Sequence, residues 1–128
     1  MPLTRISLPA GKSAEYRKGL TDGIQQALVE TFNVPRDDQF MLLSEHRPDD
    51  IVYDRHYLGI ERSDDFVTIQ LTVSNTRTRE QKQALYRRIV ERLAERPGLR
   101  KEDVFINLVE VLPENWSFGM GEAQYVKT

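Results

Sequence analysis

The chain contains no cysteine, and its 128 residues carry a formal net charge of −2 without any run of basic side chains. The absence of cysteine excludes disulfide bonds, thiolate catalysis and zinc sites built on sulfur. The lack of a basic block disfavours nucleic acid and anionic membranes as partners. The start of the sequence lacks the apolar stretch of a signal peptide, and no segment is apolar enough to span a bilayer. We therefore expect a cytoplasmic protein without a membrane or nucleic-acid partner.

The composition that remains is ordinary for a globular protein, with 39% hydrophobic and 30% charged residues. It fits a single domain over residues 1–128 and is slightly lean for burying a large core. A lean core favours self-association, because neighbouring subunits can cover apolar surface that one chain leaves exposed.

The sequence contains an internal repeat. A shift of 65 positions places Leu20 on Leu85, Asp38 on Asp103, Phe40 on Phe105, Leu43 on Leu108 and Glu45 on Glu110. We assign the first unit to residues 2–45, a linker to 46–65, the second unit to 66–110 and an aromatic tail to 111–128. A residue shared by both copies is most simply explained by the fold, whereas a residue found in one copy only is a candidate for function. Pro2 falls on Val67, so the repeat itself does not require a proline there.

Each copy has the pattern of a strand, a helix and a second strand. Period-two alternation and β-forming residues predict strands over 3–8, 39–43, 66–73 and 104–109. Ser13 is a good N-cap for a helix that ends near Asn33. Thr78 and Gln81 form the pattern of a capping box for the second helix, which the Arg-Pro-Gly sequence at 96–98 terminates.

This order of elements predicts an α/β fold. The two strands of each β-α-β unit should be parallel, with a right-handed crossover. Two such units give a four-stranded sheet with both helices on one face. The other face stays bare, and packing against sister subunits is the simplest way to cover its apolar residues, so we expect an oligomer.

Pro2 is the first candidate for chemistry. Removal of the initiator methionine would expose a secondary amine, and an α-amino group titrates near ~8 rather than near ~10.4 as lysine does. An apolar pocket lowers such a pKa further, so the amine could act as general base or acid near neutral pH. It could also form an imine with a carbonyl substrate. Taken alone, Pro2 is more simply a common second residue.

Several features together resemble the tautomerase superfamily, and within it the family of malonate semialdehyde decarboxylase and its relatives. They are the Pro2-Leu3 start, the doubled β-α-β unit, the His-Arg-Pro sequence at 46–48, Arg77 and the Trp-Ser-Phe-Gly sequence at 116–119. The resemblance runs nearly end to end. It implies a homotrimer, catalysis by the amino-terminal proline, and no metal or cofactor. It also implies a small carboxylic acid as substrate: a 2-oxo or 3-oxo acid, its enol, or an unsaturated acid.

The resemblance also implies roles for individual residues. Pro2 matches the catalytic proline, Asp38 the aspartate beside it, and Arg77 one of two arginines that bind the substrate carboxylate. Trp116, Phe118 and Tyr125 match the hydrophobic wall of the pocket. Asp38 recurs as Asp103, so a structural role in the turn is an equal alternative for it. Trp116 and Phe118 could equally be core of a subunit interface.

One position departs from the family pattern. The decarboxylase pattern reads Arg-Pro-Arg where this chain has Asn75-Thr76-Arg77. Asn75 can bind substrate by hydrogen bonds but carries no charge, so the grip on a carboxylate is weaker. The sequence therefore favours a tautomerase of small 2-oxo acids. The alternatives are a decarboxylase or hydratase of malonate semialdehyde-like 3-oxo acids, and a non-catalytic scaffold or binding module on the same fold.

Overall fold

The computed structural model of the protein describes residues 1–127, so only Thr128 of the predicted tail lies outside the described residues. The first copy forms strand β1 (Leu3–Pro9), helix α1 (Ala14–Phe32) and strand β2 (Met41–His46). The second copy forms β3 (Val67–Ser74), α2 (Arg79–Glu95) and β4 (Val104–Val111). Short 3₁₀ helices lie at Pro48–Asp50 (η1), Tyr57–Gly59 (η2), Lys101–Asp103 (η3) and Pro113–Asn115 (η4).

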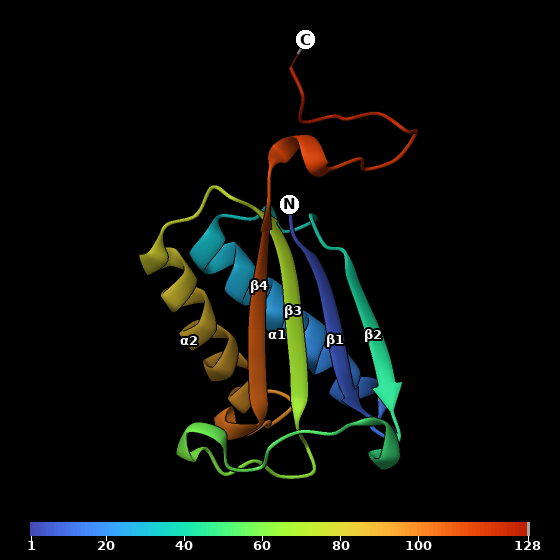
Figure 1. The fold of residues 1–128 in the computed structure, drawn as a ribbon, viewed down its shortest axis with the longest axis vertical. Coiled ribbons are helices and arrows are strands. Elements are labelled where there is room, and N and C mark those ends of the chain that lie inside the picture. Colours follow the sequence, from blue (N-terminus) through green and yellow to red (C-terminus); the bar gives the residue numbers. More distant parts are fainter. Residues whose placement is uncertain (128) are drawn as a thin grey trace.

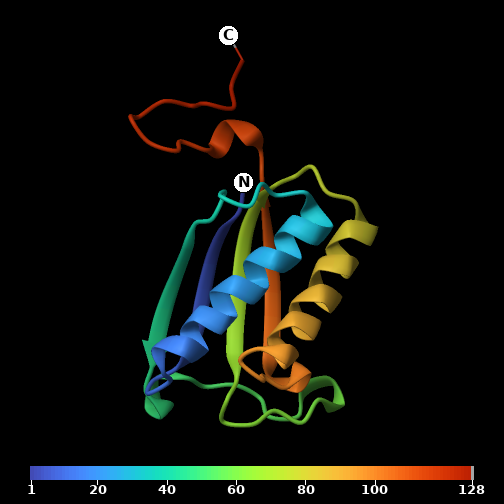
Figure 2. The same ribbon diagram turned by 180° about the vertical axis from the view of Figure 1, so that it is seen from behind.

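The four strands form one sheet in the order β2-β1-β3-β4. β1 and β2 are parallel, β3 and β4 are parallel, and the two copies join through the antiparallel pair β1 and β3. Both helices cover the same face of the sheet (Figures 1 and 2). This architecture confirms the predicted α/β fold. Because β1 and β3 run in opposite directions, equivalent points of the two copies lie at opposite ends of the sheet.

A single core lies between the sheet and the two helices. Its fully buried side chains come from alternate positions of the central strands and from one stripe on each helix; they include Ile6, Leu8, Leu20, Ile24, Leu28, Ile69, Leu71, Leu85, Ile89 and Leu93. Burial of each such side chain stabilises the folded state by about 1.5–3 kcal/mol. The helices approach closely at Gly23, where an added Cβ would lie 2.9 Å from Cδ2 of Leu93.

The helix ends confirm the predicted caps. The Ser13 hydroxyl accepts a hydrogen bond from the Tyr16 amide, and Thr78 and Gln81 form a complete capping box. Asn33 ends α1 in the left-handed conformation with φ 56°, and Gly98, its counterpart in the repeat, has φ 96°. The two copies share the positive φ at this position, but α2 ends earlier in the repeat, because Arg96 is already extended where α1 is still helical.

The observed strand limits differ from the predicted ones by one to three residues, most of all in β2. β2 runs over Met41–His46 rather than 39–43, because it is an edge strand whose last three residues, at 44–46, are polar and break the apolar alternation. In this strand Glu45 forms an ion pair with Arg17 of α1 at 2.8 Å. In β1 the buried positions are Thr4, Ile6 and Leu8, so a threonine takes a place in the core-facing row.

Within residues 1–127, no helix covers the second face of the sheet (Figure 1). Its centre is polar: Arg5 pairs in register with Gln70, and the Gln70 amide donates to Asn107 at 3.0 Å. Around this centre Leu42 and Phe105 are about half exposed. The bare face is therefore mixed, with a polar centre and apolar side chains around it, rather than apolar throughout.

The chain termini and the linker lie at opposite ends of the sheet. The start of β1 and the tail after β4 meet at the upper end in Figure 1, and the linker between β2 and β3 crosses the lower end. None of the helices formed by residues 1–127 is long and apolar enough to cross a bilayer.

Candidate active site

A cavity of about 220 Å³ lies at the upper end of the sheet, between the start of β1 and the tail. It is lined by Met1, Pro2, Leu3, Phe40, Trp116, Ser117 and Phe118. Pro2 is buried, and the Thr4 amide donates to the Phe40 carbonyl at 3.0 Å, which fixes the start of β1 against the segment that leads into β2. The wall is thus largely apolar and aromatic.

The tail forms the aromatic side of this cavity. Trp116 donates its indole N–H to the Ser74 hydroxyl at 3.0 Å and stacks on Phe118, with ring centroids 5.4 Å apart. Tyr125 packs edge-on against Phe118, with centroids 4.8 Å apart. The Gln124 side chain closes the loop, because it accepts from the Phe118 amide and donates to the Gly119 carbonyl. Tyr125 therefore supports the wall from behind and does not line the cavity.

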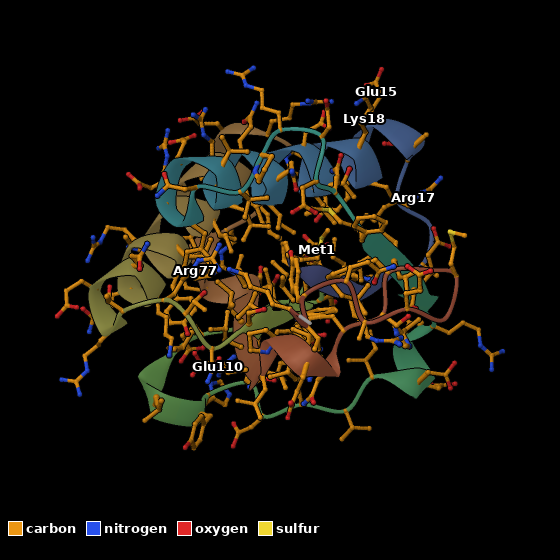
Figure 3. The ribbon with its side chains drawn as sticks, turned by 90° about the horizontal axis from the view of Figure 1, so that it is seen from above. Met1, Glu15, Arg17, Lys18, Arg77 and Glu110 are labelled. Atoms are coloured by element: carbon orange, nitrogen blue, oxygen red, sulfur yellow. The ribbon has the colours of Figure 1, made fainter. Side chains whose placement is uncertain are left out.

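Arg77 is held at the C-terminal end of α1. Its guanidinium donates to the Phe32 carbonyl at 2.8 Å and to the Thr76 hydroxyl at 2.9 Å, and it lies 4.9 Å from the centre of the Phe32 ring. Figure 3 looks down on this end of the molecule, with Met1 near the centre and Arg77 to its left. A cation of the second copy is therefore oriented by the helix of the first.

Asp38 lies in the turn between α1 and β2, on the same end of the molecule. Its Oδ1 atom is buried and has no hydrogen-bond partner among the described residues. Its main-chain carbonyl accepts from the buried side chain of Gln25 at 3.0 Å. The carboxylate is thus placed by its backbone and is not held by hydrogen bonds to Oδ1.

The amino group at the start of the chain has a perturbed pKa. Burial at the cavity lowers the pKa of the Met1 amine below its ordinary value of 8.0, because desolvation disfavours the charged form. The positive charge of Arg77 lowers it further, and the negative charge of Asp38 opposes both effects. Both charged side chains therefore lie within electrostatic reach of this amine.

The structure brings most of the predicted site residues to one end of the molecule. Pro2, Trp116 and Phe118 line the cavity, and Asp38 and Arg77 act on the amine at its edge. Asn75 is exposed, and its main-chain N–H donates to the Val111 carbonyl at 2.9 Å.

Sequence reasoning missed Phe40 and Gln25. Phe40 recurs as Phe105, which favours a role in the fold, whereas Gln25 belongs to no motif. The repeat itself could have singled out Gln25, because its counterpart in the second copy is Val90.

Comparison with known proteins identifies the protein family. Two families, each described as tautomerase enzyme, match residues 38–119 and 2–59. The chain belongs to the tautomerase family.

Individual relatives match along nearly the whole chain. It is 42% identical over 127 residues to the probable tautomerase YusQ of Bacillus subtilis (strain 168), covering 99% of this chain and 100% of that protein. Its structure resembles the crystal structure of FG41 malonate semialdehyde decarboxylase inhibited by 3-bromopropiolate, with a TM-score of 0.90. The two sequences are 41% identical, and the match covers 96% of this chain and 93% of the other. A fused 4-OT wild-type symmetric trimer shares the fold, with a TM-score of 0.78 at 17% identity over 94% of each chain.

Proposed function

We propose that this protein is an enzyme that interconverts the keto and enol forms of small 2-oxo acids, with the amine of Pro2, exposed by removal of Met1, as general base and acid. The observation that carries the proposal is the buried start of β1 beside an aromatic cavity, where the pKa of the Met1 amine is lowered and one guanidinium and one carboxylate act on it. Removal of Met1 would place the Pro2 amine next to the same groups. An amine that is neutral near pH 7 can accept a proton, as general base catalysis requires.

The proposed reaction moves one proton between two atoms of the substrate. Arg77 binds the substrate carboxylate, because a guanidinium matches that group with two charge-assisted hydrogen bonds. The neutral Pro2 amine takes the proton of the enol hydroxyl and returns it to the adjacent carbon, so the enol becomes the ketone and the amine is restored. The aromatic wall of Trp116 and Phe118 excludes water and favours the neutral amine.

The distribution of charge also supports a choice of substrate. Arg77 is the cation that acts on the amine, and Asn75 is neutral, so we expect acids with one carboxylate to be preferred over dicarboxylates. The apolar wall favours a substrate with an aromatic or aliphatic body. We further propose that the active form is a cytoplasmic homotrimer whose subunits cover the bare sheet face. The symmetric trimer of the fused 4-OT supports this assembly.

A second candidate function is decarboxylation of a 3-oxo acid such as malonate semialdehyde. The 41% identity to a malonate semialdehyde decarboxylase favours it. This reaction uses the amine in its cationic form, which would polarise the carbonyl while carbon dioxide leaves. The two reactions therefore need opposite protonation states of the same amine.

The test is a steady-state assay of protein whose intact mass shows that Met1 has been removed. Phenylenolpyruvate, 2-hydroxymuconate and malonate semialdehyde are offered side by side across a pH series. The proposal expects ketonisation of the enols, fastest with the monocarboxylate, and a rate that falls as the pH drops through the amine pKa. Decarboxylation that weakens as the pH rises would support the second candidate. Inactivity toward all three would favour a scaffold role.

A further inference from the structure

The buried side chain of Gln25 ties the Asp38 turn to α1. The Gln25 side chain is 7% exposed, and its Nε2 atom donates to the carbonyls of Asp38, Arg36 and Pro35 at 3.0, 3.2 and 3.4 Å. A single amide thus holds nearly the whole turn that separates the helix from β2.

The repeat shows that the turn itself does not need this amide. The Asp38 amide donates to the Pro35 carbonyl at 3.0 Å, and the equivalent Asp103 amide donates to the Arg100 carbonyl at 3.0 Å. The residue of α2 that corresponds to Gln25 is Val90, which has no polar side-chain atom to donate. The same turn therefore forms with and without a buried amide beneath it.

What differs between the copies is how the aspartate is held. The Asp103 carboxylate is fully buried and accepts from the Ser63 amide at 2.7 Å and from the Ser63 hydroxyl at 2.6 Å. The Asp38 carboxylate has a buried oxygen without any partner in the described part of the chain. Asp103 is thus held through its carboxylate, whereas Asp38 is held through its main-chain carbonyl.

Gln25 is also a poor choice for stability alone. Its Oε1 atom is buried and has no hydrogen-bond partner among residues 1–127, and an unsatisfied buried acceptor costs free energy. An apolar side chain at the equivalent place in α2 avoids that cost. A residue that is unfavourable for folding and present in only one copy points to a requirement of the site.

We propose that Gln25 is a positioning residue, which fixes the main chain of Asp38 so that the carboxylate stays free of structural hydrogen bonds and acts on the amine at Pro2. The inference rests on the proposed function. The hydrogen bond from the Thr4 amide to the Phe40 carbonyl completes the path, because it joins the same turn to the strand that begins beside Pro2. Loss of the Gln25 amide would let the carboxylate shift relative to the amine without removing its charge.

The experiment follows the titration of the Pro2 amine directly, by ¹⁵N NMR of protein labelled at proline and freed of Met1. The wild type is compared with Gln25→Met, Asp38→Asn and the double variant. Gln26→Met is the matched control, since it makes the same change at the next, exposed position of α1. At the adjacent amine of Met1, Asp38 raises the pKa and Arg77 lowers it, and we expect the same two charges to act on the Pro2 amine once Met1 is removed. We therefore expect Gln25→Met to lower the amine pKa in the direction of Asp38→Asn, with no further change in the double variant.

Activity provides the second readout. We expect Gln25→Met to lower kcat roughly 10-fold, because a displaced catalytic group costs rate, while KM changes far less. The loss should vanish in the Asp38→Asn background. If Gln25→Met does not fold, Gln25→Val, which introduces the residue of the second copy, is measured in the same way.

Two outcomes overturn the inference, and both differ from failure of the proposed function. An unchanged amine titration with a lower melting temperature would mean that Gln25 only stabilises the turn. Additive effects of Gln25→Met and Asp38→Asn would mean that the amide does not act through Asp38. If Pro2→Ala keeps full activity, the proposed function fails, yet the NMR titration still decides whether Gln25 positions Asp38.

Discussion

The two ends of the sheet are built from equivalent residues and have opposite characters. At the upper end, Pro2 and Phe40 line a cavity, and Asp38 keeps a carboxylate oxygen without a partner. At the lower end, Val67 is fully buried and Asp103 is bonded to Ser63 of the linker.

Aromatic packing fills the lower end. Phe66 stacks on Tyr53 with ring centroids 4.2 Å apart and meets Phe105 edge-on at 6.0 Å. The same repeat thus gives one end that is closed by the linker and one end that is left open beneath the tail. The comparison teaches that the β-α-β unit supplies the frame, whereas the segments outside the repeat decide which end can hold a ligand.

The sharpest test of this comparison is to alter the first residue of each copy. We expect Pro2→Ala to lower kcat/KM by about 10²- to 10⁴-fold, because the rigid ring that fixes the amine is lost, with little change in stability. Val67→Ala should leave activity intact and lower the free energy of unfolding by about 2 kcal/mol, because Val67 is fully buried. Enol ketonisation and urea unfolding measure the two effects. Equal activity of Pro2→Ala and wild type would contradict the assignment.

The two aspartates should separate in the same way. Asp38→Asn should lower kcat about 100-fold, and it should shift the acid limb of the pH–rate profile to lower pH, because the charge that raises the pKa of the Met1 amine, and by our proposal that of the Pro2 amine, is gone. Asp103→Asn should instead lower the free energy of unfolding by about 2 kcal/mol, since the buried charge is lost and an amide has one acceptor oxygen for the two Ser63 donors. A pH–rate series and urea denaturation of both variants check the pair. A stability loss confined to Asp38→Asn would reverse the two roles.

Arg77 and its counterpart Lys12 give a third contrast. Arg77→Met should raise KM for a carboxylate substrate roughly 10- to 100-fold, because a charge-assisted contact is lost. Lys12 pairs with Asp65 at 2.6 Å on the surface, so Lys12→Met should cost less than about 1 kcal/mol of stability and leave KM unchanged. Substrate saturation curves decide the matter; a KM that stays constant in Arg77→Met would remove Arg77 from the binding site.

The smallest effect should be the same in both copies. Ser13→Ala and Thr78→Ala each remove a side-chain cap, so each should lower the free energy of unfolding by about 1 kcal/mol without affecting kcat. Thermal and urea unfolding of the two variants test this equality. A loss of activity in either variant would show that the helix caps of the β-α-β units also affect the candidate site.

The fold was largely predictable because its signals are local and doubled. The capping box at Thr78, the turn at Asn33 and the alternation in the central strands each agree with the structure, and the repeat removes ambiguity between them. The limits of β2 were not predictable, because an edge strand tolerates polar residues on both faces. The burial of Thr4 was hidden for a similar reason: a polar residue in a core position interrupts the pattern that identifies the core.

The candidate site was predictable only where side chains themselves carry the signal. Pro2, Arg77 and Trp116 stand out by residue type and position, and the structure places them at one end of the molecule. Gln25 acts on backbone carbonyls, which every residue possesses, so no sequence motif marks it. The support of Phe118 by Tyr125 depends on the path of the tail, which local patterns do not determine.

Trp116 is the single tryptophan of the chain, and it forms part of the cavity wall with its indole N–H on Ser74. All of the intrinsic indole fluorescence of the protein therefore originates at the candidate site. An acid that enters the cavity changes the surroundings of this one fluorophore, so its emission can count occupied sites without a label or a turnover assay. The molecule thus contains its own optical probe, and a library of small acids can be screened for binding before any reaction is known.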